Sequence, residues 1–146
     1  MIEKKISAEV IFSVEFYDVD SMKVCWHGNY IKYFEKARCA LLKKIGYGYT
    51  QMEESGYAFP VTEVKVKYIK PLIFQQKVKA TAILEEYESA LKIKYILSDA
   101  KTGEITTKGS SSQVAIKMDT KTTCFDCPDI FINKVKKLLK ETKDAE

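Results

Sequence analysis

Two aspartates, Asp18 and Asp20, lie close in sequence to the only histidine of the chain, His27. A strand-like run precedes them, a loop over residues 21–28 follows, and a helical pattern begins at Asn29. A carboxylate can act as a general base or a nucleophile, and histidine titrates near neutral pH. The first turn of a helix adds unpaired N–H groups and a partial positive charge, which stabilise a developing oxyanion. These residue types in this order favour acyl chemistry.

A longer pattern surrounds these residues and continues into the helix. Its parts, in order, are Asp18-Val19-Asp20, Trp26-His27, Asn29-Tyr30, Tyr33-Phe34-Glu35, Ala37-Arg38 and the Tyr-x-x-Pro step of Tyr68 and Pro71. The pattern resembles that of the hotdog-fold acyl-CoA thioesterases, within them the 4-hydroxybenzoyl-CoA thioesterase-like superfamily, and most closely the YbgC-type acyl-CoA thioester hydrolases. The resemblance covers about residues 8–137, which is most of the chain.

The resemblance implies roles for four residues. Asp20 would be the catalytic carboxylate, as general base toward water or as nucleophile, and His27 would assist it. Backbone N–H groups around His27 and Gly28 would polarise the thioester carbonyl, and one such donor is worth roughly 3–4 kcal/mol in the transition state. Tyr30 belongs to the core face of the helix and is also a candidate for lining the acyl pocket.

Other interpretations stay open at this point. Asp is common in turns, so Asp18 and Asp20 also fit a purely structural role, and a single histidine beside a tryptophan is often structural. The function has an alternative in a hotdog module that binds acyl-CoA or acyl carrier protein without turnover. A hotdog dehydratase is a third candidate, which the position of the charged motif before the helix disfavours.

A thioesterase of this kind needs no cofactor, because coenzyme A enters as part of the acyl-CoA substrate. The resemblance implies a homodimer that associates into a homotetramer, and acyl carrier protein is the other candidate carrier of the acyl group. Some relatives bind the phosphates of coenzyme A through basic residues in a turn that here, at residues 86–90, is acidic. Lysines on nearby strands are candidate replacements, although such side chains are usually only solvated: Lys65, Lys67, Lys92 and Lys94.

Length and composition fit one domain over residues 1–146. The net charge of +4 is too small to indicate nucleic-acid binding. No apolar run approaches the ~20 residues that span a membrane, and no signal peptide is visible, so we expect no transmembrane segment and a cytoplasmic location. The four cysteines are expected as free thiols. Cys124 and Cys127 form a lone C-x-x-C without the further ligands of a zinc site, so no metal site is predicted.

The hydrophobic pattern predicts the elements that position the candidate residues. Alternation predicts strands over residues 8–18, 61–70, 76–86, 91–97 and 104–118. Helical spacing predicts a long helix from Asn29 that ends at Gly46, and a C-terminal helix over about residues 129–141. Between these two helices, Thr50-Gln51-Met52-Glu53 resembles a capping box that opens a short helix. This order predicts an α+β fold with an antiparallel sheet wrapped around a long central helix, and the resemblance narrows it to the hotdog fold.

Overall fold

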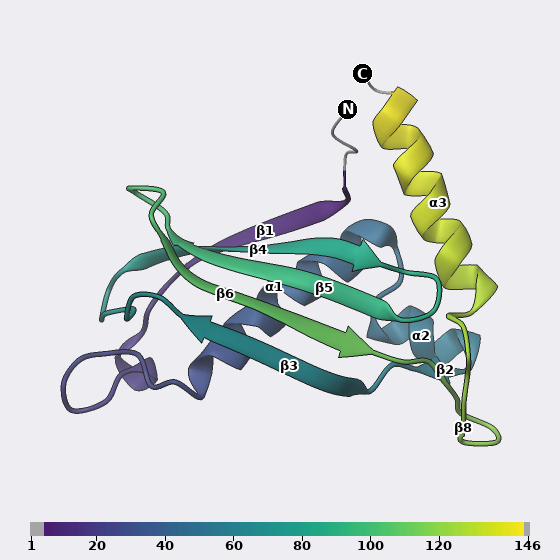
Figure 1. Cartoon of the computed structure of the whole chain (residues 1–146), viewed down its shortest axis with the longest axis horizontal. Coiled ribbons are helices and arrows are strands. Elements are labelled where there is room, and N and C mark those ends of the chain that lie inside the picture. The colour runs from purple at the N-terminus through teal and green to yellow at the C-terminus, as the bar shows by residue number, and fades with distance from the viewer. Residues whose placement is uncertain (1–4, 145–146) are drawn as a thin grey trace.

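A computed structural model describes the backbone of residues 5–144 and the side chains of residues 5–142; residues 1–4 and 145–146 of the predicted domain lie outside the described part. Its main element is a five-stranded antiparallel sheet in the order β1-β4-β5-β6-β3. The strands are β1 (Ser7–Ser13), β3 (Val61–Tyr68), β4 (Lys77–Glu86), β5 (Leu91–Asp99) and β6 (Ile105–Gln113). Helix α1 (Asn29–Ile45) lies across one face of this sheet (Figure 1).

Smaller elements close the two ends of the sheet. A 3-10 turn, η1 (Phe16–Asp18), follows β1, and α2 (Tyr49–Ser55) follows α1. A second, three-stranded sheet consists of β2 (Tyr57–Ala58), β7 (Ile116–Lys117) and β8 (Thr122–Thr123). The C-terminal helix α3 (Asp129–Asp144) contacts α1 and extends beyond the sheet (Figure 1). No helix in the described part of the chain is both long and apolar enough to cross a membrane.

Helix α1 buries the residues whose spacing predicted it. The positions expected on its core face are all buried: Tyr30, Phe34, Ala37, Leu41 and Ile45. Gly46 ends the helix in the left-handed conformation, with φ of 87°, and its N–H bonds to the carbonyls of Leu42 and Lys43. The predicted central helix and its end are therefore confirmed.

The helix lies unusually close to the sheet at Gly109. The ring of Phe34 stacks on that of Tyr95, with centroids 4.5 Å apart and planes 5° from parallel. A Cβ atom on Gly109 would lie 2.4 Å from the Phe34 ring and 2.7 Å from the carbonyl oxygen of Lys65. Only a residue without a side chain fits this contact.

Several predicted boundaries are wrong, and a local turn, the strand pairing or a local hydrogen bond accounts for three of them. The first strand ends at Ser13 rather than at residue 18, because the chain turns there into η1. The long strand predicted to end at residue 118 stops at Gln113, opposite Val61 and Leu91, the first residues of both neighbouring strands, and the next pairing is with β2. Helix α2 begins at Tyr49 rather than at the predicted Thr50 capping box, because the side chain of Gln51 accepts the N–H of Gly48 at 3.0 Å.

Candidate active site

A small hairpin carries the two aspartates toward the start of α1. Val19 and Cys25 form an isolated antiparallel bridge. On one side of this bridge the N–H of Trp26 donates to the carbonyl of Asp18 at 2.9 Å, and on the other the N–H of Asp20 donates to the carbonyl of Val24 at 3.0 Å. The hairpin fixes how the chain enters the helix, because His27 and the helix follow directly after it.

The two aspartates have different surroundings. Asp18 is buried, and its Oδ2 accepts the N–H of Glu15 at 3.0 Å, which closes the turn of η1. Asp20 is exposed, and its Oδ1 accepts the N–H of Met22 at 2.9 Å and that of Val24 at 3.4 Å. The Oδ2 of Asp20 accepts no hydrogen bond from residues 5–142. Asp18 therefore has a structural role, whereas one carboxylate oxygen of Asp20 is open to a ligand.

His27 stands at the surface, just before the helix. Its ring lies beside that of Trp26, with centroids 5.1 Å apart. Its backbone carbonyl accepts the hydroxyl of Tyr68 and the N–H of Tyr30, both at 3.3 Å. The imidazole forms no hydrogen bond with the described residues, so it is open to a bound molecule.

The start of α1 also leaves backbone donors unpaired. Gly28 is the N-cap of the helix, and no side chain caps this end. The N–H of Asn29 bonds to the carbonyl of Trp26 at 2.9 Å, whereas the N–H groups of His27 and Gly28 have no acceptor within residues 5–144. Unpaired N–H groups at a helix start suit an anionic oxygen.

A cavity of about 270 Å³ opens beside the helix start. It is lined by Val24, Cys25, His27, Tyr30, Tyr68, Ile69, Lys70 and Pro71. Of the four predicted site residues, the structure brings His27 and Tyr30 to this cavity. Gly28 lies next to His27 in sequence but outside the lining, and Asp20 lies on the hairpin, also outside it.

Tyr30 connects the cavity to the segment that follows β3. It is buried, and its hydroxyl oxygen accepts the N–H of Leu72 at 3.2 Å, while the carbonyl of Leu72 accepts the N–H of Cys25 at 2.8 Å. Burial raises the pKa of Tyr30 above its ordinary value, against the opposing effect of the Leu72 bond. Tyr30 therefore stays protonated near neutral pH, and its hydroxyl proton can be donated to a ligand.

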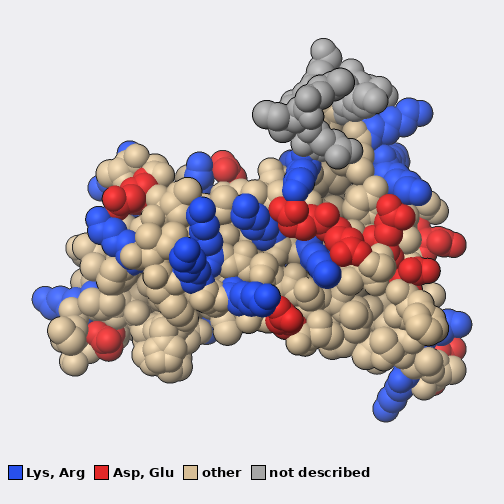
Figure 2. All heavy atoms as spheres, viewed as in Figure 1, with Lys and Arg blue, Asp and Glu red and all other residues tan. Residues whose placement is uncertain are grey.

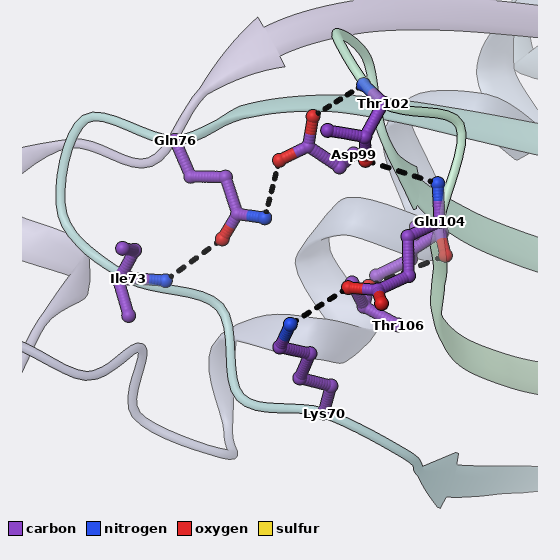
Figure 3. A network of polar contacts seen from close by, with 8 residues as sticks. Lys70, Ile73, Gln76, Asp99, Thr102, Glu104 and Thr106 are labelled. Atoms are coloured by element: carbon purple, nitrogen blue, oxygen red, sulfur yellow. Dashed lines mark hydrogen bonds and ion pairs between the residues drawn. The ribbon is translucent and has the colours of Figure 1, made fainter.

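A polar network connects the segment that follows β3, residues 70–76, to the end of β5 and the loop between β5 and β6 (Figure 3). The ammonium of Lys70 pairs with Glu104 at 2.8 Å, and the amide of Gln76 donates to Asp99 at 2.9 Å. The N–H groups of Thr102 and Lys101 and the amide of Gln76 hold the pKa of Asp99 below its usual range. The sequence motif predicted Tyr68 and Pro71 in this region, but no local signal marks the network, because Lys70 and Glu104 are 34 residues apart and Gln76 and Asp99 are 23 apart.

The structure contains a second cavity away from the helix start. A larger cavity of about 640 Å³ lies at the other end of β3, and its walls are mostly apolar, including Tyr57, Phe59, Ile116 and Met118.

All four cysteines are free thiols, as predicted. Within the described part of the chain, no three His, Cys, Asp or Glu side chains come together as metal ligands do.

Comparisons with known proteins agree with this fold. Residues 14–143 match the model of the thioesterase-like superfamily, and the chain belongs to this superfamily. A putative acyl-CoA thioesterase of Bacillus subtilis is 28% identical over 103 residues, which are 70% of this chain and 75% of the relative. A putative esterase of Aquifex aeolicus is 33% identical over 73 residues, which are 50% of this chain and 57% of the relative.

A solved thioesterase structure is similar to this chain over nearly its whole length. The DHNA-CoA thioesterase of Staphylococcus aureus superimposes with a TM-score of 0.80 and 29% identity, covering 96% of this chain and 95% of that protein. The hotdog fold and the family resemblance inferred from the sequence are confirmed. Thioester hydrolysis, the predicted class of reaction, is that of the named relatives. The roles of individual residues stay predictions.

Proposed function

We propose that the chain is a thioesterase that hydrolyses an acyl-CoA to the free acid and coenzyme A. The observation that carries this proposal is the helix start, where His27 and Tyr30 line a cavity and the N–H groups of His27 and Gly28 have no acceptor within residues 5–144. A thioester carbonyl placed against these donors would be polarised in the way acyl transfer needs. The names of the relatives support the same reaction.

In the proposed reaction, water attacks the carbonyl carbon of the thioester. Asp20 takes a proton from this water as general base, and the two N–H groups hold the negative charge of the tetrahedral intermediate. The C–S bond then breaks, and the coenzyme A sulfur leaves and is protonated. If Asp20 acts as nucleophile, its carboxylate attacks the carbonyl carbon, the C–S bond breaks and the coenzyme A thiolate leaves, and water then hydrolyses the resulting anhydride of Asp20 and the acyl group. His27 hydrogen-bonds the water or the thioester in either route.

A second copy of the chain would complete the site. Strand β3 is an edge strand whose outer side pairs with no described residue, and unpaired edges of this kind are used for association. If two copies pair antiparallel through β3, the end of β3 in one copy lies beside the start of β3 in the other. The apolar cavity at the start of the second copy's β3 then adjoins the cavity at the end of this one. A homodimer, and a homotetramer built from it, remain the expected assemblies.

Exposed apolar side chains near the hairpin also favour such an interface. Four of them are more than half exposed: Phe16 at 78%, Tyr17 at 79%, Met22 at 80% and Trp26 at 54%. Single exposed apolar residues are common, but a cluster beside one functional segment is typical of a contact surface. In a dimer these residues would enclose the thioester and exclude water from it.

A binding module without turnover is the second candidate, and one observation favours it. The Oδ1 of Asp20 bonds to its own loop, and Asp20 does not line the cavity of the single chain. An aspartate that only shapes the loop would give binding without hydrolysis. The two candidates therefore differ in whether Asp20 reaches the bound thioester.

Hydrolysis of a panel of acyl-CoAs, from short aliphatic to long-chain and aromatic, separates these candidates. We expect release of the coenzyme A thiol by the wild-type protein and a loss of at least about 10²-fold in Asp20→Asn. Asp126→Asn, at an exposed position away from the site, is the matched control and should keep full activity. Unchanged turnover in Asp20→Asn would contradict the role of Asp20. Binding of acyl-CoA without turnover by the wild type would favour the binding module, with an acyl carrier protein thioester as the next substrate to test.

A further inference from the structure

Lysine side chains gather on the face of the sheet opposite α1. Figure 2 shows this face, with basic side chains over its middle and acidic ones toward the turn between β4 and β5. Three exposed lysines on three adjacent strands define what we call the lysine patch: Lys67 on β3, Lys108 on β6 and Lys94 on β5. Each alternates along its strand with residues that face the helix side.

The strand register brings like charges together in the patch. Lys67 lies directly opposite Lys108, and Lys94 lies opposite Ser110, which is two residues after Lys108. Directly opposite side chains in antiparallel strands have Cβ atoms about 4.5–5.5 Å apart, and like charges at this separation destabilise the sheet. The patch therefore carries an electrostatic cost that a bound anion would relieve.

Neighbouring lysines on the same face are neutralised, whereas the patch is not. Lys65 pairs with Glu63 at 3.2 Å, Lys92 with Glu86 at 3.6 Å and Lys79 with Glu9 at 3.8 Å. The three patch lysines form no ion pair with another residue in the part of the chain that the structure describes. Ser110, whose side chain is short, lies between Lys65 on β3 and Lys94 on β5.

The patch lies across the end of β3 from the candidate active site, on the other face of the sheet. Lys67 directly precedes Tyr68, which lines the cavity at the helix start. The N–H groups of Ile69 and Lys70 donate to the carbonyl of Thr106 at 2.9 and 3.0 Å, and Thr106 lies two residues before Lys108 on β6. A long ligand held in the cavity could therefore pass around the end of β3 and reach the patch.

We propose that the lysine patch binds the phosphate groups of the nucleotide end of coenzyme A. This inference rests on the proposed function, because it assigns the carrier end of the same substrate. Phosphate oxygens form strong charge-assisted hydrogen bonds with ammonium groups. The acidic turn at residues 86–90 cannot supply these bonds. Of the four lysines considered from the sequence, two are neutralised by carboxylates, and Lys108 was not among them.

Calorimetric titration with coenzyme A tests the patch directly. We expect the double variant Lys67→Gln/Lys108→Gln to bind coenzyme A at least about tenfold more weakly than the wild type, since it loses two charge-assisted contacts. Lys92→Gln, on the same face but paired with Glu86, is the control and should bind as the wild type does. Equal affinity of the double variant and the wild type, or no binding by the wild type, would overturn the proposal.

Kinetics separate this inference from the proposed function. The KM for an acyl-CoA should rise in the double variant, whereas kcat/KM for the N-acetylcysteamine thioester of the same acyl group, which has no phosphate, should not change. If the wild type hydrolyses neither thioester, the proposed function fails while the calorimetric result still decides on the patch. Weaker binding to vesicles of anionic lipid with unchanged coenzyme A binding would assign the lysines to a membrane surface and overturn the proposal.

Discussion

The hydroxyl of Tyr68 donates a hydrogen bond to the backbone carbonyl of His27 across 3.3 Å. This bond joins the last residue of the edge strand to the residue that precedes the N-cap of α1. The Tyr68 ring also meets the Tyr30 ring edge-on, with centroids 4.9 Å apart. The strand end and the helix start thus form one unit around the cavity, so a change at Tyr68 should alter the position of His27.

Tyr68→Phe should lower activity while leaving the fold intact. The variant keeps the ring contact with Tyr30 but loses the bond that positions the carbonyl of His27. Because Tyr68 is 51% exposed, water can replace the lost hydroxyl contact, and the free energy of unfolding should fall by less than about 1 kcal/mol. Small misplacements of a site cost up to about 10²-fold, so we expect kcat/KM for acyl-CoA to fall by about tenfold or more.

Urea unfolding and acyl-CoA kinetics on the same preparations check this prediction. Tyr87→Phe is the control, because Tyr87 lies in the turn between β4 and β5, away from the site, and its hydroxyl bonds to no described residue. A Tyr68→Phe variant with wild-type kcat/KM would show that the bond to His27 does not contribute to the reaction.

Tyr30→Phe should instead destabilise the protein. The N–H of Leu72 would lose its acceptor inside the core, and an unpaired buried donor costs about 1–3 kcal/mol. Tyr47→Phe is a matched control: Tyr47 is also buried, but its partner Ser55 keeps a second bond to the carbonyl of Met52. Urea unfolding should therefore show a larger loss for Tyr30→Phe, and the reverse order would contradict this account of Leu72.

Alanine at the two aspartates should separate structure from chemistry. Asp18→Ala removes the acceptor of the Glu15 N–H and should cost about 1–2 kcal/mol of stability, as loss of a helix cap does. Asp20→Ala affects an exposed loop where water can replace the carboxylate, so its free energy of unfolding should change by less than about 1 kcal/mol. If Asp20 is the catalytic carboxylate, turnover by the folded protein should fall more in Asp20→Ala than in Asp18→Ala. Equal stability losses at the two positions would show that both aspartates are structural.

The sequence was sufficient for the parts of the fold that local pattern determines. The period of apolar residues from Tyr30 to Ile45 located α1, and Gly46 marked its end, because both depend on neighbours along the helix. The alternation of Val78, Ala80, Ala82 and Leu84 located β4, whose buried face is this set. Free cysteines also followed from composition.

Contacts between distant residues were not accessible in this way. The bond between Tyr30 and Leu72 joins residues 42 apart, and no local signal marks either of them as a partner. Strand β6 ends at Gln113 because both neighbouring strands begin opposite this residue, although Val114-Ala115-Ile116 continues to suit a strand. Lys108 became a candidate only when the register placed it opposite Lys67. For the same reason the sequence grouped Asp20 with His27, whereas only His27 lines the cavity.

Gly109→Ala should be among the most damaging single substitutions in the sheet. The added methyl group would lie 2.4 Å from the Phe34 ring and 2.7 Å from a backbone carbonyl, so the helix or the strand must move. Overpacking of this kind typically costs about 1–3 kcal/mol. Ser110→Ala, the next residue on the opposite face of β6, is the control and should be nearly neutral. Thermal unfolding that gives the two variants the same midpoint would contradict the close packing of α1 on the sheet.

Buried thiols and phenols should make the protein less stable at alkaline pH. Burial, with the carboxylates of Glu86 and Asp126 adding to it, raises the pKa of Cys127 from 9.0 to about 12. Burial also raises the pKa of Cys25 and of several tyrosines: Tyr30, Tyr33, Tyr47 and Tyr95. Above about pH 9 the unfolded chain therefore holds fewer protons at Cys127 than the folded chain, and the free energy of unfolding falls as the pH rises toward 12.

Urea unfolding between pH 8 and 10.5 checks the slope that Cys127 contributes. Cys127→Ala should be less stable at every pH because it loses buried sulfur, but its stability should decline less steeply with pH than that of the wild type. Cys39→Ala, which removes a thiol at an exposed position, is the control variant. Thiol reactivity is a second check, because the thiolate is the form that reacts. A disulfide reagent at pH 8 should modify the exposed Cys39 quickly, and should modify the buried Cys127 only as the protein unfolds. Rapid modification of Cys127 in the folded protein would show that this thiol is not held protonated by burial.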